Sequence, residues 1–327
     1  MSQRIIALDY IRIVAVLMIL LCHYFLFSDL NSGVGRYLAG TGNIIFFVVS
    51  ALLYGVKYHT PNGNSEAQID CYIFAIRRCI KLGSSVWPFL ILLVTSYIIY
   101  NVDFSWVDVS LNFVFLGYLG KLPGNGHLWF LTILIVCYAE MLFLLKLKSI
   151  GSYVPWLIIV SSVIVLLIGE KMGIPSGVFV AIGLFGFVFI KANWILEKSK
   201  EMHWAVAVSM IVLNVLALIL EYNGLFGYSR VLHFLLTGIC GLSLLSVLLK
   251  IVPNKNSSVI SFLSGISFEI YIVHHTMCAG PFFAITHWSF GHVLNFIALV
   301  VLSIIIATML NFISKRVSKF LMMMCGK

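Results

Sequence analysis

The chain has 327 residues, of which 61% are hydrophobic and only 10% are charged, and its formal net charge is +9. Soluble globular domains are about a quarter charged, so this composition, with a mean hydropathy of +1.06, excludes a soluble protein and predicts a polytopic membrane protein. The basic residues lie in short loops between apolar segments, as membrane topology requires, and we therefore expect no nucleic-acid partner.

Eleven apolar segments follow one another along the chain. Ten are long enough, or nearly so, to cross a hydrocarbon core about 30 Å thick, whereas the segment at 107–119 is short. The ten lie at 5–28, 40–57, 84–100, 128–145, 154–169, 176–191, 203–221, 231–250, 258–279 and 291–313. The sequence therefore predicts an all-α integral membrane protein, a bundle of about ten transmembrane helices plus one short re-entrant or interfacial segment.

The distribution of lysine and arginine gives these spans a direction. If both termini are cytoplasmic and 107–119 does not cross, the inner loops and tails hold sixteen basic residues and the outer loops hold four. Cytoplasmic loops are enriched in Lys and Arg, so this arrangement is favoured over one in which 107–119 crosses and every later loop inverts. We expect a multi-pass protein of the cell inner (plasma) membrane with both termini in the cytoplasm.

The connections between the apolar segments predict no separate soluble domain, and we expect residues 1–327 to form a single transmembrane domain. The longest inner connection contains a turn-rich stretch at 60–65 and then an amphipathic helix that leads into the third span. The seven cysteines are scattered, without a Cys-x-x-Cys pair, and so predict neither a disulfide framework nor a zinc site. We expect no bound metal.

The first span contains three ionisable residues, Asp9, Arg12 and His23. Such residues cost at least ~2.5–3.5 kcal/mol each within a membrane helix, so they usually face a protein or water-lined interior and mark function. Arg12 and His23 fall within roughly 20° of one helix face, about 16 Å apart along the axis. A neutral imidazole is suited to act as general base towards a hydroxyl. The alternative is an interfacial Asp9–Arg12 ion pair with a snorkelling His23.

Two further groups are candidates at the ends of spans. Arg77, Arg78 and Lys81 lie at the cytoplasmic mouth of the third span, where they would bind a phosphate or pyrophosphate, although basic residues are expected there for topology alone. His127 and Trp129 begin the fifth span from the outer side, a position that also fits an aromatic belt.

The ninth span places Glu269 near the middle of the membrane. A carboxylate there needs a buried partner, for which Arg12 or a histidine is the natural candidate. Several histidines map to the same outer half of the membrane, and together they indicate a shared site more strongly than any one histidine does. They are His23, His127, His274 and His275.

Five motifs, in order along nearly the whole chain, resemble acyltransferase family 3. Members of this family are integral membrane O-acyltransferases that transfer acetyl or other short acyl groups to extracytoplasmic carbohydrates. The matching pieces are Leu8 to Arg12 with His23, Gly42 to Ser50, Arg78 to Lys81, His127 to Leu131, and Ser267 to His274.

Two positions depart from the family pattern. Ala51 stands where glycine is usual after the second-span serine, and Lys81 replaces the second arginine of the third motif. Because lysine lacks the planar bidentate fork of arginine, a donor-clamping role for position 81 is weakened.

The resemblance implies an O-acyltransferase that moves an acyl group, most often acetyl, from cytoplasmic acyl-CoA to a hydroxyl of an extracytoplasmic carbohydrate or lipid-linked sugar. His23 would be either the general base or a transient acyl carrier. The resemblance implies that the catalytic residues are His23, Arg12, Asp9 and Glu269. It implies that the residues that bind the donor, acetyl-CoA, are Arg77, Arg78 and Lys81. Supporting or substrate-binding positions are His127, Trp129, Ser50, Tyr271 and His274.

Other classes stay open beside this one. A proton-coupled secondary transporter would use the intramembrane residues Asp9, Arg12, Glu140 and Glu269, with the histidines, as a proton relay, although no Gly/Pro-broken segments occupy equivalent positions in two halves. A non-catalytic scaffold or flippase partner would tolerate substitution of His23. Family members often carry a fused extracytoplasmic domain; we expect none here, and hence either a stand-alone enzyme or one that depends on a separate extracytoplasmic partner protein. Membrane lipids are the other expected partner.

Overall fold

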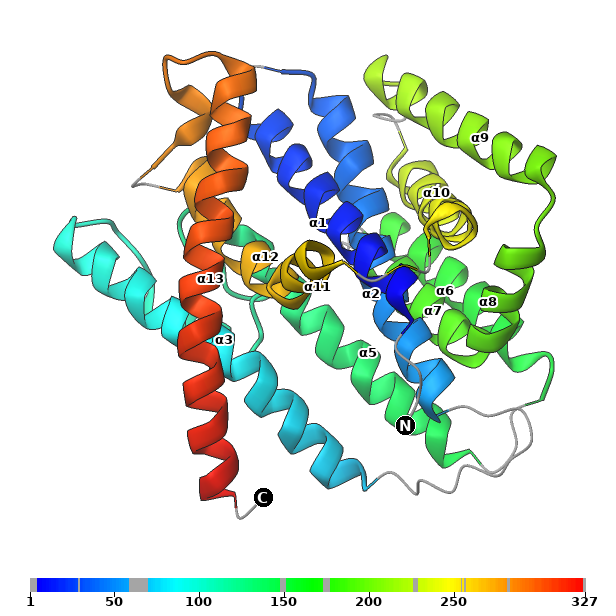
Figure 1. Cartoon of the computed structure of the whole chain (residues 1–327), viewed down its shortest axis with the longest axis horizontal. Coiled ribbons are helices and arrows are strands. Elements are labelled where there is room, and N and C mark those ends of the chain that lie inside the picture. Colours follow the sequence, from blue (N-terminus) through cyan, green and yellow to red (C-terminus); the bar gives the residue numbers. More distant parts are fainter. Residues whose placement is uncertain are drawn as a thin grey trace. The chain divides into compact units, whose positions relative to one another are not determined.

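The computed structural model describes residues 5–28, 30–58, 70–147, 151–172, 177–225, 229–253, 255, 257–280 and 283–325. These residues form helices joined by short connections and include no β-strand, which confirms the predicted all-α class (Figure 1). The turn-rich stretch expected at 60–65 lies outside them.

Within this part of the chain, eight helices are long and apolar enough to cross a membrane. They are α1 (Ile6–Phe27), α2 (Ser32–Tyr58), α3 (Cys71–Ile99), α5 (Trp129–Lys146, preceded by the 3-10 turn η1, Gly126–Leu128), α6 (Val154–Lys171), α9 (Trp204–Tyr222), α10 (Arg230–Ile251) and α13 (His292–Met324). The shorter elements are α4 (Trp106–Phe113), α7 (Val178–Ile190), α8 (Ala192–Glu201), α11 (Ser258–Gly265), α12 (Ser267–Ala279) and η2 (Ile285–His287). A membrane bundle is thereby confirmed.

The two other predicted spans are shorter or broken. α7 has 13 residues and is bent by 82° against α8, so this pair is a broken span or a re-entrant loop. The span predicted at 258–279 is divided between α11 and α12. The segment predicted not to cross contains α4, whose eight residues correspond to about 12 Å of helix, far less than the hydrocarbon core.

The helices group into two compact units, which we describe separately. Unit 1 comprises Met1–Ala67 and Val136–Ser264, and unit 2 comprises Gln68–Ile135 and Gly265–Lys327. One boundary passes through α5, and another falls just before Gly265, the last residue of α11. A single transmembrane domain over 1–327 stays a prediction.

In unit 1, α2 is the central helix and packs against α1, α7, α9 and α10. Its first turn is held especially closely. A side chain at Gly33 would meet the backbone of Glu221 at the end of α9, and one at Gly35 would meet Leu26 and the carbonyl of Cys22 near the end of α1. Glycine at these two positions therefore lets the ends of three helices approach one another.

In unit 2, α3, α12 and α13 pack together. The Asp70 side chain accepts hydrogen bonds from the backbone N–H groups of Tyr72 and Ile73, at 2.9 and 3.0 Å, which caps α3 at its start. The helix then continues without interruption to Ile99. The predicted amphipathic segment and the third span are thus one helix.

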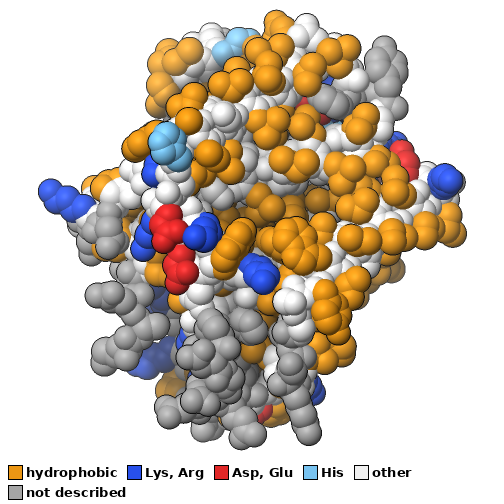
Figure 2. Space-filling view, turned by 90° about the vertical axis from the view of Figure 1, so that its right-hand side faces the viewer, with side chains coloured by type: hydrophobic (Ala, Val, Ile, Leu, Met, Phe, Trp, Pro, Cys, Tyr) orange, Lys and Arg blue, Asp and Glu red, His pale blue; other side chains and the backbone are white. Residues whose placement is uncertain are grey.

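Apolar side chains cover much of the outer surface. Figure 2 shows hydrophobic side chains spread widely over one described face. On α6 and α9 they include Trp156, Ile164, Ile211 and Leu216, all about half exposed or more. Soluble proteins rarely expose apolar patches of this extent, so this surface fits contact with lipid.

Candidate active site

The Asp9–Arg12 ion pair, which was the alternative to a functional role for these residues, is present in unit 1. Arg12 Nη1 lies 3.9 Å from Asp9 Oδ1, and the same oxygen accepts a hydrogen bond from Ser264 Oγ at 2.8 Å. Asp9 and Ser264 are both buried. Since 3.9 Å is too long for a hydrogen bond, the serine is the closer of these two partners of the carboxylate. Asp9 therefore joins α1 to the end of α11.

His23 lies on the same unbroken helix as Arg12 and is half-buried. Its Nδ1 is 3.0 Å from the carbonyl oxygen of Ile19 and 3.5 Å from Cys22 Sγ, and its ring stacks on Phe27. A carbonyl only accepts hydrogen bonds, so the contact with Ile19 requires a proton on Nδ1. The neutral ring then carries its lone pair on Nε2. This is the tautomer that a general base or an acyl-accepting nucleophile requires.

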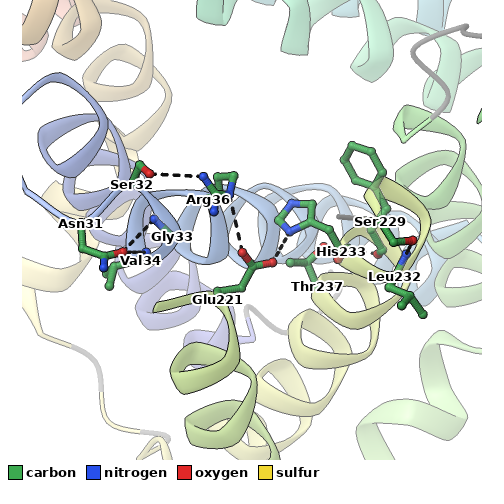
Figure 3. A network of polar contacts seen from close by, with 11 residues as sticks. Asn31, Ser32, Gly33, Val34, Arg36, Glu221, Ser229, Leu232, His233 and Thr237 are labelled. Carbon is green, nitrogen blue, oxygen red and sulfur yellow. Dashed lines mark hydrogen bonds and ion pairs between the residues drawn. The ribbon is translucent and has the colours of Figure 1, made fainter. Parts of the chain in front are cut away.

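Unit 1 also contains a charged network that sequence reasoning missed (Figure 3). Glu221 at the end of α9 is 1% exposed, and His233 Nδ1 donates to its Oε1 at 2.5 Å, while Arg36 Nε lies 3.6 Å from its Oε2. Arg36 also donates to Ser32 Oγ at 3.2 Å. Arg36, Glu221 and His233 come from α2, α9 and α10, so the network ties together the ends of three helices. Each lies at the edge of an apolar segment, and only long-range packing reveals that they meet.

In unit 2, three of the four histidines that were expected to share a site contact one another. The ring of His127 stacks on that of His275, with centroids 4.7 Å apart and planes at 11°, and meets His274 edge-on at 5.1 Å. His23, the fourth, belongs to unit 1. The sequence analysis placed these three residues in one half of the membrane, and in unit 2 they contact one another. The site that all four histidines were expected to share stays a prediction.

Each of these three rings is held by the main chain. The distances to carbonyl oxygens are 3.0 Å from His127 Nε2 to Ile272, 2.7 Å from His274 Nδ1 to Tyr271, and 2.6 Å from His275 Nδ1 to Gly124. Tyr271 also donates its hydroxyl to the carbonyl of His127 at 2.7 Å. In the parts of the chain that are described, no group of three or more His, Cys, Asp or Glu side chains is placed to hold a metal ion. The expected absence of a metal stays a prediction.

Glu269 has a partner that the sequence analysis did not foresee. Its Oε1 accepts a hydrogen bond from Ser85 Oγ at 2.9 Å, and Ser85 Oγ lies 2.9 Å from Ser314 Oγ, which is 3.0 Å from Ser84 Oγ. All four side chains are buried. We call Ser84, Ser85, Glu269 and Ser314 the serine–glutamate cluster. The cluster joins α3, α12 and α13. In it the neutral hydroxyl of Ser85 donates the hydrogen bond to Glu269, for which the sequence predicts Arg12 or a histidine.

The predicted donor-binding residues precede this cluster on α3. Arg77 and Lys81 are exposed, whereas Arg78 is half-buried, with its guanidinium 5.2 Å from the ring centroid of Phe74. Arg78, Lys81 and Ser85 follow at spacings of three and four residues, so they lie along one face of the helix. The basic residues thus lead along α3 to the serine–glutamate cluster.

Two further candidates have contacts of their own. Ser50 is half-buried on α2 and donates its hydroxyl to the carbonyl of Phe46 in the same helix, at 3.3 Å. Trp129 is half-buried at the start of α5, and its ring meets that of Phe130 edge-on. Their roles stay predictions.

The family model described as an acyltransferase domain matches residues 5–312, which cover most of both units and every candidate residue predicted from the sequence, and which end two residues before Ser314. No curated protein and no solved structure matched the chain. Because the family model covers nearly the whole chain, the protein belongs to acyltransferase family 3.

Proposed function

We propose that this acyltransferase moves an acyl group, acetyl in the first instance, from cytoplasmic acyl-CoA to a hydroxyl of an extracytoplasmic carbohydrate or lipid-linked sugar. The observation that carries the proposal is the state of His23, whose Nδ1–H is held by the Ile19 carbonyl. An acyltransferase that uses a hydroxyl acceptor needs a base or nucleophile, and Nε2 of this ring supplies either.

Two routes use the same nitrogen. As general base, His23 takes the acceptor proton while the acceptor oxygen attacks the thioester carbonyl. The C–S bond breaks, and the imidazolium returns the proton to the leaving thiolate of CoA. As acyl carrier, Nε2 attacks the thioester carbonyl first, the C–S bond breaks, and CoA leaves as the thiolate. The acceptor hydroxyl then attacks the acyl-imidazolium and the C–N bond breaks. The proton that the hydroxyl loses balances the one that the thiolate takes up. Both routes end with an ester, free CoA thiol and neutral histidine.

Other residues receive supporting roles in this proposal. Arg77, Arg78 and Lys81 bind the phosphates of the donor, because guanidinium and ammonium groups are the common protein ligands of phosphate. Asp9 and Arg12 fix α1, which carries His23. Glu269 is proposed as a catalytic residue together with His23, Arg12 and Asp9. The proposed substrate-binding or supporting residues are His127, Trp129, Ser50, Tyr271 and His274.

The bias of basic residues toward the inner loops supports a location in the inner (plasma) membrane with both termini in the cytoplasm. The acceptor then lies on the opposite side of the membrane from the donor. We propose that the protein acts there alone or with a separate extracytoplasmic partner protein.

The test of this proposal is mass spectrometry of cell-surface glycans from cells with the intact gene, with the His23→Ala variant and without the gene. We expect one acyl group to be lost from a surface glycan in both altered strains. Purified protein with radiolabelled acetyl-CoA and the affected glycan should then transfer label to the glycan. Glycans of identical mass in all three strains would contradict the proposal.

One observation favours a second candidate, a proton-coupled secondary transporter. Glu140 Oε2 in α5 is buried and has no hydrogen-bond partner among the described residues, and its carboxylate packs against Gly186 of α7. Buried carboxyl groups within membrane helices often mark proton pathways. Proton-dependent solute uptake by reconstituted protein without acyl-CoA would identify this class.

A further inference from the structure

α3 and α13 cross where three serine hydroxyls meet. Ser314 Oγ lies 3.0 Å from Ser84 Oγ and 2.9 Å from Ser85 Oγ, and all three side chains are buried. From this crossing the two helices separate, and the start of α3 and the end of α13 lie toward the same end of unit 2 (Figure 1). Residues just after Ser314 therefore continue in the same direction as residues just before Ser84.

A lysine flanks the crossing on each helix. Lys81 precedes Ser84 by three residues, and its backbone carbonyl oxygen accepts a hydrogen bond from the Ser84 hydroxyl at 3.0 Å. Lys315 directly follows Ser314. Both lysine side chains are exposed. Glu269, which accepts a hydrogen bond from Ser85, is buried beside the same crossing and is only 6% exposed. The two lysines, on different helices, thus flank the crossing that holds this acid.

The charge balance of this arrangement favours an anionic ligand. Lys81, Lys315 and Arg78 bring three positive charges, and Glu269 brings one negative charge. Lysine binds a phosphate as a point charge and lacks the bidentate fork of arginine, so a phosphate site built on lysine gains from a second cation on another side of the anion.

We propose that Lys315 belongs to the phosphate site of the donor and completes that site from α13, opposite Lys81 and Arg78 on α3. The inference rests on the proposed function, because it takes acyl-CoA as the donor, and it names the chemistry that the site recognises: the phosphate and diphosphate esters of the nucleotide part. The phosphate of a lipid headgroup has the same chemistry and is the other source of such a ligand.

The neighbouring Arg316 offers a matched control. It carries the same charge on the same exposed end of α13, but its guanidinium lies over the ring of Phe312, 4.2 Å from the centroid. Substitution of Arg316 therefore changes the net charge of this end of the helix without removing the cation at the crossing.

The experiment measures binding of two probes, coenzyme A and pantetheine, to the full-length protein in vesicles of zwitterionic lipid. Pantetheine shares the thiol arm of coenzyme A but has no phosphate. We expect Lys315→Gln to weaken coenzyme A binding about ten-fold, because it removes one charge-assisted contact. Lys315→Arg and Arg316→Gln should bind coenzyme A as the unsubstituted protein does, and all variants should bind pantetheine equally.

Three outcomes would overturn this inference. Coenzyme A binding that is unchanged in Lys315→Gln removes Lys315 from the site. An equal loss of pantetheine binding shows that the residue acts through the fold and not through phosphate. The third outcome is that Lys315→Gln and the unsubstituted protein differ in coenzyme A binding only after anionic lipid is added to the vesicles. That result identifies a lipid phosphate as the ligand. Failure of the unsubstituted protein to bind coenzyme A contradicts the proposed donor itself, and so is distinguishable from all three.

Discussion

His23 Nδ1 lies 3.0 Å from the carbonyl oxygen of Ile19, one turn earlier on α1. This contact decides which ring nitrogen carries the proton, because a carbonyl oxygen has none to donate. It also orients the ring, which stacks on Phe27 one turn later with centroids 6.1 Å apart. A histidine held in this way by its own helix needs no carboxylate partner to select the tautomer.

We expect His23→Ala to lower acyl transfer by at least about 10²-fold, the lower range for loss of a positioned base. The measurement is transfer of labelled acetyl from acetyl-CoA by purified protein. His292→Ala, which removes an exposed histidine at the start of α13, is the control and should retain full activity. Full activity in His23→Ala with unchanged folding would reject a catalytic role for His23.

A single turnover without acceptor separates the two routes at His23. If the ring carries the acyl group, labelled acetyl-CoA leaves covalent label on His23 that the acceptor then removes. If the ring acts only as general base, the protein stays unlabelled while transfer proceeds once acceptor is added.

The Arg78→Ala substitution should raise KM for acyl-CoA about ten-fold and change kcat little, because a phosphate contact far from the reacting carbonyl contributes to binding in both ground and transition states. Steady-state kinetics with varied acyl-CoA measure both constants. Lys319→Ala, an exposed cation near the end of α13, serves as control. Unchanged KM in Arg78→Ala would indicate that the basic residues serve only topology.

The helices were largely readable from the sequence because apolar length is a local property. The first apolar segment, 5–28, became α1 at Ile6–Phe27. The segment at 258–279 was not readable in the same way, because its apolar pattern continues through the point where α11 ends at Gly265 and α12 begins at Ser267. Hydropathy records which residues prefer lipid or core, and it does not record where packing interrupts a helix.

Contacts between candidate residues were predictable from the sequence only where the residues lie at the same depth in the membrane. His127, His274 and His275 were expected at one depth, and they contact one another. By contrast, Ser85 is a small polar residue with no periodic signal, and its hydrogen bond to Glu269 depends on how α3 packs against α12. Such side-by-side placement of distant helices is a tertiary property that a single sequence does not specify.

Ser85→Ala should destabilise the protein by about 1.5–3 kcal/mol, because it removes the hydroxyl that donates a hydrogen bond to the buried side chain of Glu269. Thermal unfolding of the purified protein in detergent, followed by circular dichroism, measures the change. Ser96→Ala on the same helix is the control, since the Ser96 hydroxyl donates only to the Leu92 carbonyl one turn earlier. Equal unfolding midpoints for the two variants would show that the Glu269 hydrogen bond contributes little to stability.

Glu221→Gln should destabilise the protein more strongly, by about 3–5 kcal/mol, because breaking a buried ion pair leaves its partners without the charge that compensates them. Glu221 is 1% exposed and lies between His233 and Arg36 on two other helices, so the loss should loosen the ends of α2, α9 and α10 together. Glu201→Gln is the matched control, because Glu201 forms an exposed pair with Lys198 at 2.8 Å and such surface pairs contribute little. Unfolding midpoints in detergent, with hydrogen exchange at the three helix ends, measure the effect. A Glu221→Gln protein as stable as the Glu201→Gln control would mean that helix packing around Gly33 and Gly35, and not the charged network, holds these helix ends together.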